Sequence, residues 1–205
     1  MTRPESSGEQ RAQERFGTSS RAASFYAHQT LPHLNQQMQE FIARMDMVYL
    51  ATADSRGTCD CSFRAGEPGF VQVLDDRTLV YPEYRGNGVL ASVGNMLENP
   101  HVGLIFLDYY QTTIGLHVNG SARVLGPHEA AVLPNLTAGM AETAHNKGGR
   151  HPEAWVLIGV EEAYIHCSKH VPLLKRLEKQ IAWGSDDERV KGGNFFKVIP
   201  ALARP

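Results

Sequence analysis

Residues 54–119 contain a close succession of short strand patterns and one helix pattern, most of them separated by turn-forming residues. A long strand pattern at residues 113–125 alternates apolar and polar side chains, which places them on opposite faces of a strand. The clusters Asp54–Gly57 and Gly66–Gly69 are typical of turns. Further strands are expected at residues 47–53, 58–64, 70–74, 78–81, 101–107 and 155–167. This spacing predicts a mainly β protein.

The strand at 58–64 carries polar groups on a single face. Asp60, Ser62 and Arg64 alternate with Cys59, Cys61 and Phe63 on the opposite face. Arginine offers a planar fork of donors suited to phosphate, and serine adds a short neutral donor. An ordinary solvated strand face is the alternative interpretation.

A glycine-rich turn, Tyr84–Gly88, precedes the helix pattern at residues 89–97. Free N–H groups and the helix dipole favour an anion at such a position. Ser92 and Asn95 are three residues apart, so they share one face of this helix. A plain loop and a surface helix would produce the same pattern.

Helices are expected on both sides of the strand-rich stretch. Their predicted bounds are 10–26, 35–45, 127–133, 136–142 and a basic helix at 171–183 that ends at Gly184. The pair Glu161–Glu162 interrupts the last strand and indicates a bulge or bend. The segment 145–151, rich in histidine, glycine and basic residues, is either a lid or an exposed loop.

Composition excludes several classes of protein. A net charge of −2 over 205 residues gives no basic footprint for nucleic acid. The 3 cysteines form no disulfide framework, and no apolar run is long enough to cross a membrane. We therefore expect a cytoplasmic protein. Cys59 and Cys61 are spaced too closely for a typical zinc pair, so no metal is expected and buried cysteines are favoured.

Three phrases carry a resemblance to a known family. SFRAGEPGFVQVLDDRTLVYPEYRGNG, ASVGNMLENPHVGLIF and GLHVNGSARV follow one another in an order and spacing that resemble the pyridoxamine 5'-phosphate oxidase-like FMN-binding split barrels. The resemblance covers roughly residues 40–170. It implies a six-stranded antiparallel split barrel with flanking helices, and a homodimer with FMN at the interface.

The resemblance also implies which residues contact the cofactor. They are Ser62, Phe63, Arg64, Tyr84, Arg85, Gly86, Asn87, Ser92, Asn95, His117 and Lys169. Lys169 is included because the phrase His166–Lys169 ends the last strand as it does in some relatives. The Trp and Arg signature that grips pyridoxal phosphate is absent from the sequence, so the vitamin substrate is not transferred. No catalytic residue is assigned.

These observations predict an FMN-dependent oxidoreductase acting on a small molecule, with a nicotinamide cofactor or oxygen as redox partner. A deazaflavin, or a haem with His117 or His166 as axial ligand, is an alternative on the same fold. A flavin-binding protein without turnover is a third hypothesis. The expected organisation is an N-terminal arm over residues 1–34, a barrel domain over 35–184, and a tail over 185–205 that packs on the body or on a partner subunit.

Overall fold

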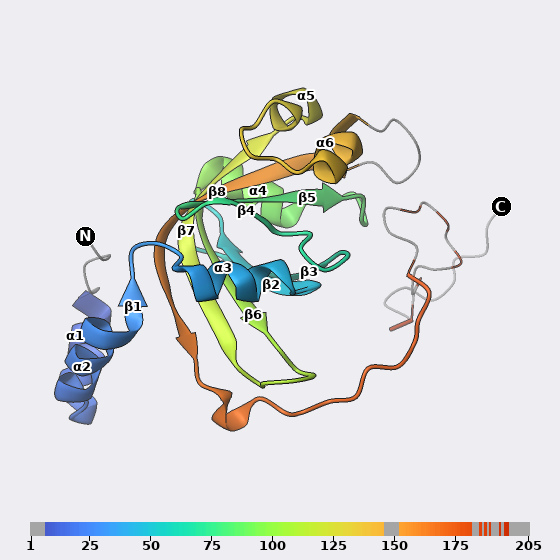
Figure 1. The fold of residues 1–205 in the computed structure, drawn as a ribbon. Helices are drawn as coiled ribbons and strands as arrows, with labels where there is room; N and C mark the ends of the chain where they lie inside the picture. The colour runs from blue at the N-terminus through green and yellow to red at the C-terminus, as the bar shows by residue number, and fades with distance from the viewer. Residues whose placement is uncertain are drawn as a thin grey trace.

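The computed structural model describes residues 7–145 and 152–181, together with residues 185, 187, 189, 193, 195 and 196. Its strands are β1 (Thr30–Leu31), β2 (Met47–Ala53), β3 (Cys59–Ala65), β4 (Gln72–Asp75), β5 (Thr78–Tyr84), β6 (His101–Leu107), β7 (Gly115–Leu125) and β8 (Pro152–His166). All pair antiparallel in a single sheet of order β3-β2-β6-β7-β8-β5-β4, with β1 added beside β8 (Figure 1).

The predicted mainly β split barrel is confirmed. The end strands β3 and β4 do not pair with each other within the described residues, so the barrel stays open along one side. Six strands have seven or more residues, while β1 and β4 are shorter additions. The bounds of β2 and β6 agree with the predicted ones at both ends.

Strand alternation creates the main core. Leu50 of β2, Phe106 of β6 and Val118 of β7 are fully buried in one cluster inside the barrel. A second, smaller cluster around Trp155 and Leu125 is covered by the helices that follow β7. The barrel interior is therefore filled with side chains, and a binding site has to lie at its rim or on its outer surface.

Six helices flank the sheet: α1 (Ser7–Phe16), α2 (Ser19–Gln29), α3 (Gln36–Ala43), α4 (Ala91–Glu98), α5 (Pro127–Ala131) and α6 (Ala138–His145), counted over the described residues. The single helix expected near the N-terminus is two helices, because Gly17 has a positive φ of 64° and breaks the run. Neither α1 nor α2 buries a residue, and the pair stands away from the barrel (Figure 1).

A β-bulge interrupts β8 where the sequence predicted an irregularity. Asn119 of β7 faces Glu162, whereas the next residue, Gly120, faces Val160, which leaves Glu161 as the extra residue. The bulge brings the two strands very close. A Cβ atom added at Gly120 would lie 2.1 Å from the carbonyl oxygen of Gly159, so only glycine fits there.

The predicted basic helix at 171–183 is wrong for the residues described. Residues 171–181 contain no helix and run as an extended segment outside the barrel (Figure 1). Its leucines remain largely exposed, with Leu173 at 66% and Leu177 at 79%. A short helix gains most of its stability by burying an apolar face, and this segment buries none. Residues 182–184, including the predicted stop at Gly184, lie outside the described residues.

The prediction of buried cysteines is also wrong. Cys59 and Cys61 are exposed because their face of β3 is not covered within the described residues, and Cys167 is exposed just after the end of β8. The described residues contain no group of three or more metal-ligating side chains. No helix in the described part of the chain is long and apolar enough to cross a membrane.

Candidate functional site

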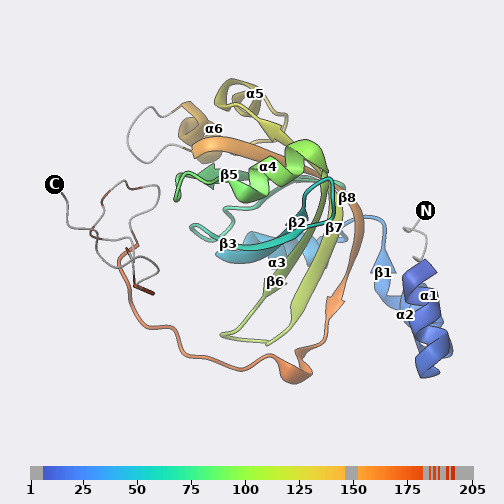
Figure 2. The ribbon, with the colours of Figure 1, turned by 180° about the vertical axis from the view of Figure 1, so that it is seen from behind.

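A cavity of about 460 Å³ lies between β3, the end of β5, the loop of residues 85–90 and the first turn of α4. Figure 2 shows β3, β5 and α4 on the same side of the barrel. Eight of the predicted binding residues line it: Ser62, Phe63, Arg64, Tyr84, Arg85, Gly86, Asn87 and Ser92. They come from three separate elements, so the fold brings together groups that are up to thirty residues apart in the chain. We call this cavity the loop pocket.

The N-terminus of α4 opens onto the loop pocket. Leu90, at the N-cap position, has the left-handed conformation with φ 54°, and its side chain caps no N–H group. Bulky residues rarely adopt this conformation, and such backbone strain clusters at ligand sites. The N–H groups of the first turn have no acceptor within the helix. This end of α4 therefore offers uncapped donors and a positive dipole.

Side-chain hydrogen bonds hold α4 against the β2–β3 hairpin. Asn95 donates from Nδ2 to Oγ1 of Thr52 at 3.0 Å, and Glu98 accepts from the Ser55 hydroxyl at 2.9 Å. Together with Ser92, these helix residues recur at every third position and form one stripe. The shared face of Ser92 and Asn95 is confirmed. Asn95 does not line the loop pocket; its amide holds α4 on β2 instead.

A carboxylate occupies the centre of the polar group in the loop pocket. The hydroxyls of Ser62 and Ser92 each donate to Oδ2 of Asp60 at 2.8 Å, and the two hydroxyl oxygens are 3.1 Å apart. Ser92 is fully buried. Strand alternation had placed Asp60 on this face, but no pattern in the sequence indicated that its carboxylate would accept both hydroxyls.

The second carboxylate in the pocket is Glu83, which sequence reasoning missed. Its Oε2 atom accepts from Nε of Arg64 at 2.9 Å, and its side chain is only 7% exposed. Burial raises the pKa of Glu83, although Arg64 opposes this shift. One signal in the sequence could have identified Glu83. It lies two residues after Tyr81 in an apolar strand, so the two side chains share one face of that strand. The Tyr81 hydroxyl is buried on the same face and has no hydrogen-bond partner among the described residues.

The remaining charged group of the pocket is also paired. Nε of Arg85 lies 3.7 Å from a carboxylate oxygen of Glu153, and the arginine side chain is half exposed. Burial raises the pKa of the neighbouring Tyr84. Because Arg64 and Arg85 are balanced by Asp60 and Glu83, the lining of the loop pocket is formally neutral.

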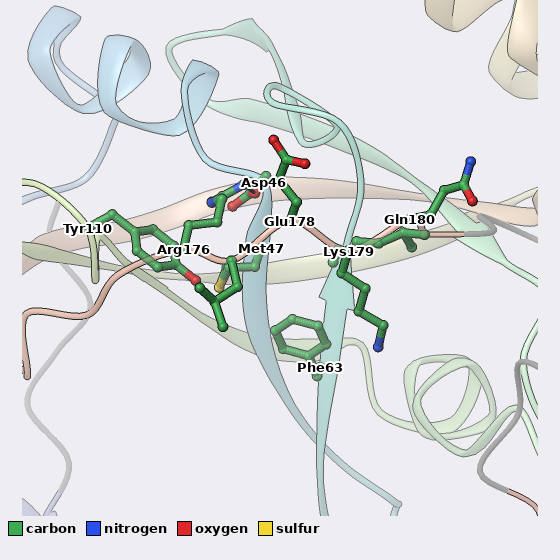
Figure 3. A pocket seen from close by; sticks show the side chains of 11 residues that line it. Asp46, Met47, Phe63, Tyr110, Arg176, Glu178, Lys179 and Gln180 are labelled. Atoms are coloured by element: carbon green, nitrogen blue, oxygen red, sulfur yellow. Dashed lines mark hydrogen bonds and ion pairs between the residues drawn. The ribbon is translucent and has the colours of Figure 1, made fainter.

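A larger cavity of about 920 Å³ adjoins the loop pocket, and both are lined by Phe63 and Ala65. The extended segment 176–181 forms its other wall. Figure 3 shows Phe63 below this segment, with Lys179 extending toward it, while Glu178 and Gln180 point the other way. We call this space the segment cavity.

The segment is tied to the barrel mainly through one arginine. Arg176 forms an ion pair with Asp46, and its guanidinium lies over the Tyr110 ring at 4.5 Å from the centroid (Figure 3). The backbone N–H of Leu174 donates to the carbonyl of Tyr109 at 2.7 Å. These contacts lie at the β6–β7 turn and at the start of β2.

Two predicted residues lie away from both cavities. Nε2 of His117 is 3.0 Å from Nδ1 of His166, and its ring stacks on Tyr164 with centroids 4.6 Å apart. Burial, together with the charge of His166, lowers the pKa of His117. His117 and His166, the two histidines that would be candidates to hold a haem, thus each have one ring nitrogen engaged by the other. Lys169 is exposed in a short 3-10 turn after β8.

Comparison with known proteins gives a family. The model of the family described as pyridoxamine 5'-phosphate oxidase matches residues 34–167. A search of curated proteins found no match.

Solved structures are similar to this chain at low identity. HupZ of Group A Streptococcus is 21% identical, with 64% of this chain and 93% of that chain covered and a TM-score of 0.46. A Clostridium acetobutylicum protein related to general stress protein 26 is 13% identical, with coverages of 63% and 85% and a TM-score of 0.46. An F420 reductase is 16% identical, with coverages of 62% and 94% and a TM-score of 0.39.

Proposed function

The chain belongs to the pyridoxamine 5'-phosphate oxidase family, and on this premise we propose that it is an FMN-dependent oxidoreductase acting on a small molecule. The observation that carries the proposal is the loop pocket, where eight predicted residues from three elements meet. Bound FMN supplies hydride-transfer chemistry, while the protein supplies binding, orientation and exclusion of water. A nicotinamide cofactor or oxygen is the proposed redox partner.

The size and donors of the loop pocket support this assignment. Cofactor sites typically enclose about 300–1,000 Å³, and this one has about 460 Å³ before any neighbouring space is added. Ser62, Ser92, Arg64 and Arg85 join the uncapped first turn of α4 as donors, a set suited to a phosphate. Asp60 and Glu83 oppose the phosphate charge, but each already has hydrogen-bond donors facing it.

The rim of the pocket supports a homodimer with the cofactor at its interface. Phe63 is 52%, Val89 70% and Leu90 43% exposed, and all three line the loop pocket. Single exposed apolar residues are normal, but adjoining ones beside a cavity are typical of an interaction surface. We propose that a second subunit covers them. Sedimentation equilibrium should give twice the chain mass, and a monomer with bound FMN would contradict this part.

We assign the segment cavity to the substrate. It adjoins the loop pocket at Phe63, and its walls combine the apolar Met47 and Ile181 with the cation of Lys179. A partly apolar molecule carrying an anionic group suits these walls. Lys179→Ala should then weaken substrate binding while leaving FMN affinity unchanged.

The test of cofactor binding is a fluorescence titration of the purified protein with FMN. Arg85→Ala should weaken FMN binding by about tenfold, because a charge-assisted contact to phosphate is lost. Arg85 is half exposed, so this variant should fold normally. Arg77→Ala, in the exposed β4–β5 turn, is the matched control and should bind like the parent. Equal affinities for the two variants would contradict the phosphate assignment. A Soret band in place of FMN binding would support a haem instead.

A further inference from the structure

The carboxylate of Asp60 already takes two of the hydrogen-bond donors of the loop pocket. Its Oδ2 atom receives the hydroxyls of both Ser62 and Ser92 at 2.8 Å, and these are neutral donors that a phosphate would also need. We propose that Asp60 is a built-in anion at the phosphate position. In this role it sets how strongly the pocket distinguishes phosphorylated ligands from unphosphorylated ones. The inference rests on the proposed flavin site.

The hydrogen bonds explain why Asp60 and a phosphate compete. A serine hydroxyl has one proton to donate, so it serves either the carboxylate or the phosphate. A phosphate bound here either receives the two hydroxyl hydrogen bonds at the expense of Asp60, or it binds without them. The uncapped N–H groups of the first turn of α4 remain available, which makes the position usable by an anion once Asp60 yields.

The charges around Asp60 lead to the same conclusion. Arg64 faces Glu83 and Arg85 faces Glu153, and the lining is already formally neutral with Asp60 counted, so a bound anion would give the pocket a net negative charge. Two negative groups within a half-buried pocket repel each other more strongly than they would in water. The phosphate of a ligand should therefore add less binding affinity in the parent protein than the number of donors in the pocket suggests.

A purely structural role for Asp60 is the competing explanation. Its bond to Ser92 also fastens α4 to β3. However, α4 keeps two other side-chain anchors, Asn95 on Thr52 and Glu98 on Ser55. In Asp60→Asn, the amide oxygen can still accept from a serine, and the amide N–H₂ becomes a donor toward phosphate. This substitution thus removes the charge and leaves the helix docked.

The experiment compares FMN with riboflavin, which lacks the phosphate, on the same proteins. Asp60→Asn should raise the preference for FMN over riboflavin by at least about tenfold relative to the parent, because the opposing charge is gone. Asp76→Asn, an exposed carboxylate in the β4–β5 turn, removes the same charge far from the pocket and should leave the preference unchanged. Thermal unfolding of each variant confirms that α4 remains in place.

Inorganic phosphate is titrated in parallel as a probe that needs no flavin. Asp60→Asn should bind it more tightly than the parent by about the same factor, since the same charge is removed. If Asp60→Asn changes neither the flavin preference nor phosphate affinity, Asp60 is only an anchor and the inference is wrong. If no form binds a flavin but the variant gains phosphate affinity, the proposed function fails and the role of Asp60 stands.

Discussion

Helix α4 and the segment 171–181 both border Phe63, yet they are built in opposite ways. The helix is short and contains a glycine, but three of its residues make side-chain hydrogen bonds to the β2–β3 hairpin. The segment is rich in leucine at helical spacing, but it is extended and exposed. The difference shows that tertiary partners, more than local propensity, decide which stretch becomes a helix.

The largest expected effect comes from breaking the buried pair beside α4. In Glu83→Ala the guanidinium of Arg64 loses its partner while 20% exposed, so the free energy of unfolding should fall by about 2–3 kcal/mol. Glu83→Gln keeps an acceptor for Nε and should lose less than half of that. Urea denaturation measures both values. Equal losses of unfolding free energy in the two variants would mean that the charge of Glu83, and not its hydrogen bond, stabilises the contact with Arg64.

The anchors of α4 come next. Asn95→Ala removes the bond to Thr52, a residue that is 4% exposed, and should cost about 1 kcal/mol. Gly94→Ala is the neighbouring control: its new Cβ meets no atom within 4 Å, so it should stabilise the helix by about 0.5–1 kcal/mol. Thermal melts of the two variants should therefore shift in opposite directions, and a destabilised Gly94→Ala would contradict the docking geometry.

The pH dependence of stability tests the contact between His117 and His166, where β8 ends and the chain continues toward the segment 171–181. Burial and His166 lower the pKa of His117, so the folded state binds fewer protons there than the unfolded state. Stability from this site is therefore fully present above the ordinary histidine pKa of about 6.5, and it is lost as the pH falls below that value through the lowered pKa of the folded state. Between about pH 7.5 and about pH 5.5, the melting temperature of the parent should drop more than the melting temperature of His117→Gln. Parallel curves would contradict the assignment.

The smallest effects are expected in the segment itself. Arg176→Ala removes an ion pair whose arginine is 55% exposed, and should change stability by about 0.5 kcal/mol or less. Leu177→Ser, at a side chain that is 79% exposed, should be neutral within the same margin. Denaturation curves that shift by more than about 1 kcal/mol would show that the segment is covered in solution, as it would be by a second subunit.

The same contrast explains what could be read from the sequence. The bounds of β2 and β6 were predicted correctly, because short apolar runs bounded by turn residues are strong signals for strands. The face shared by Asp60, Ser62 and Arg64 followed from strand alternation. The partners of Asp60 and Glu83 did not, since they depend on how α4 and β5 come to lie beside β3. The helix expected at 171–183 failed because no pattern reveals that a surface to pack on is missing.

Strand β8 joins the two parts of the sheet, and this has a consequence for folding kinetics. One edge of β8 pairs with β7, and the sheet continues from there through β6 and β2 to β3. The other edge of β8 pairs with β5 of the β4–β5 hairpin. Thr78 of β5 meets Gly159 of β8, a contact between residues far apart in the chain. Until β8 inserts, each half-sheet presents an unpaired edge. The search for this long-range pairing should therefore set the refolding rate, and the species that accumulates before it should be the one prone to aggregation.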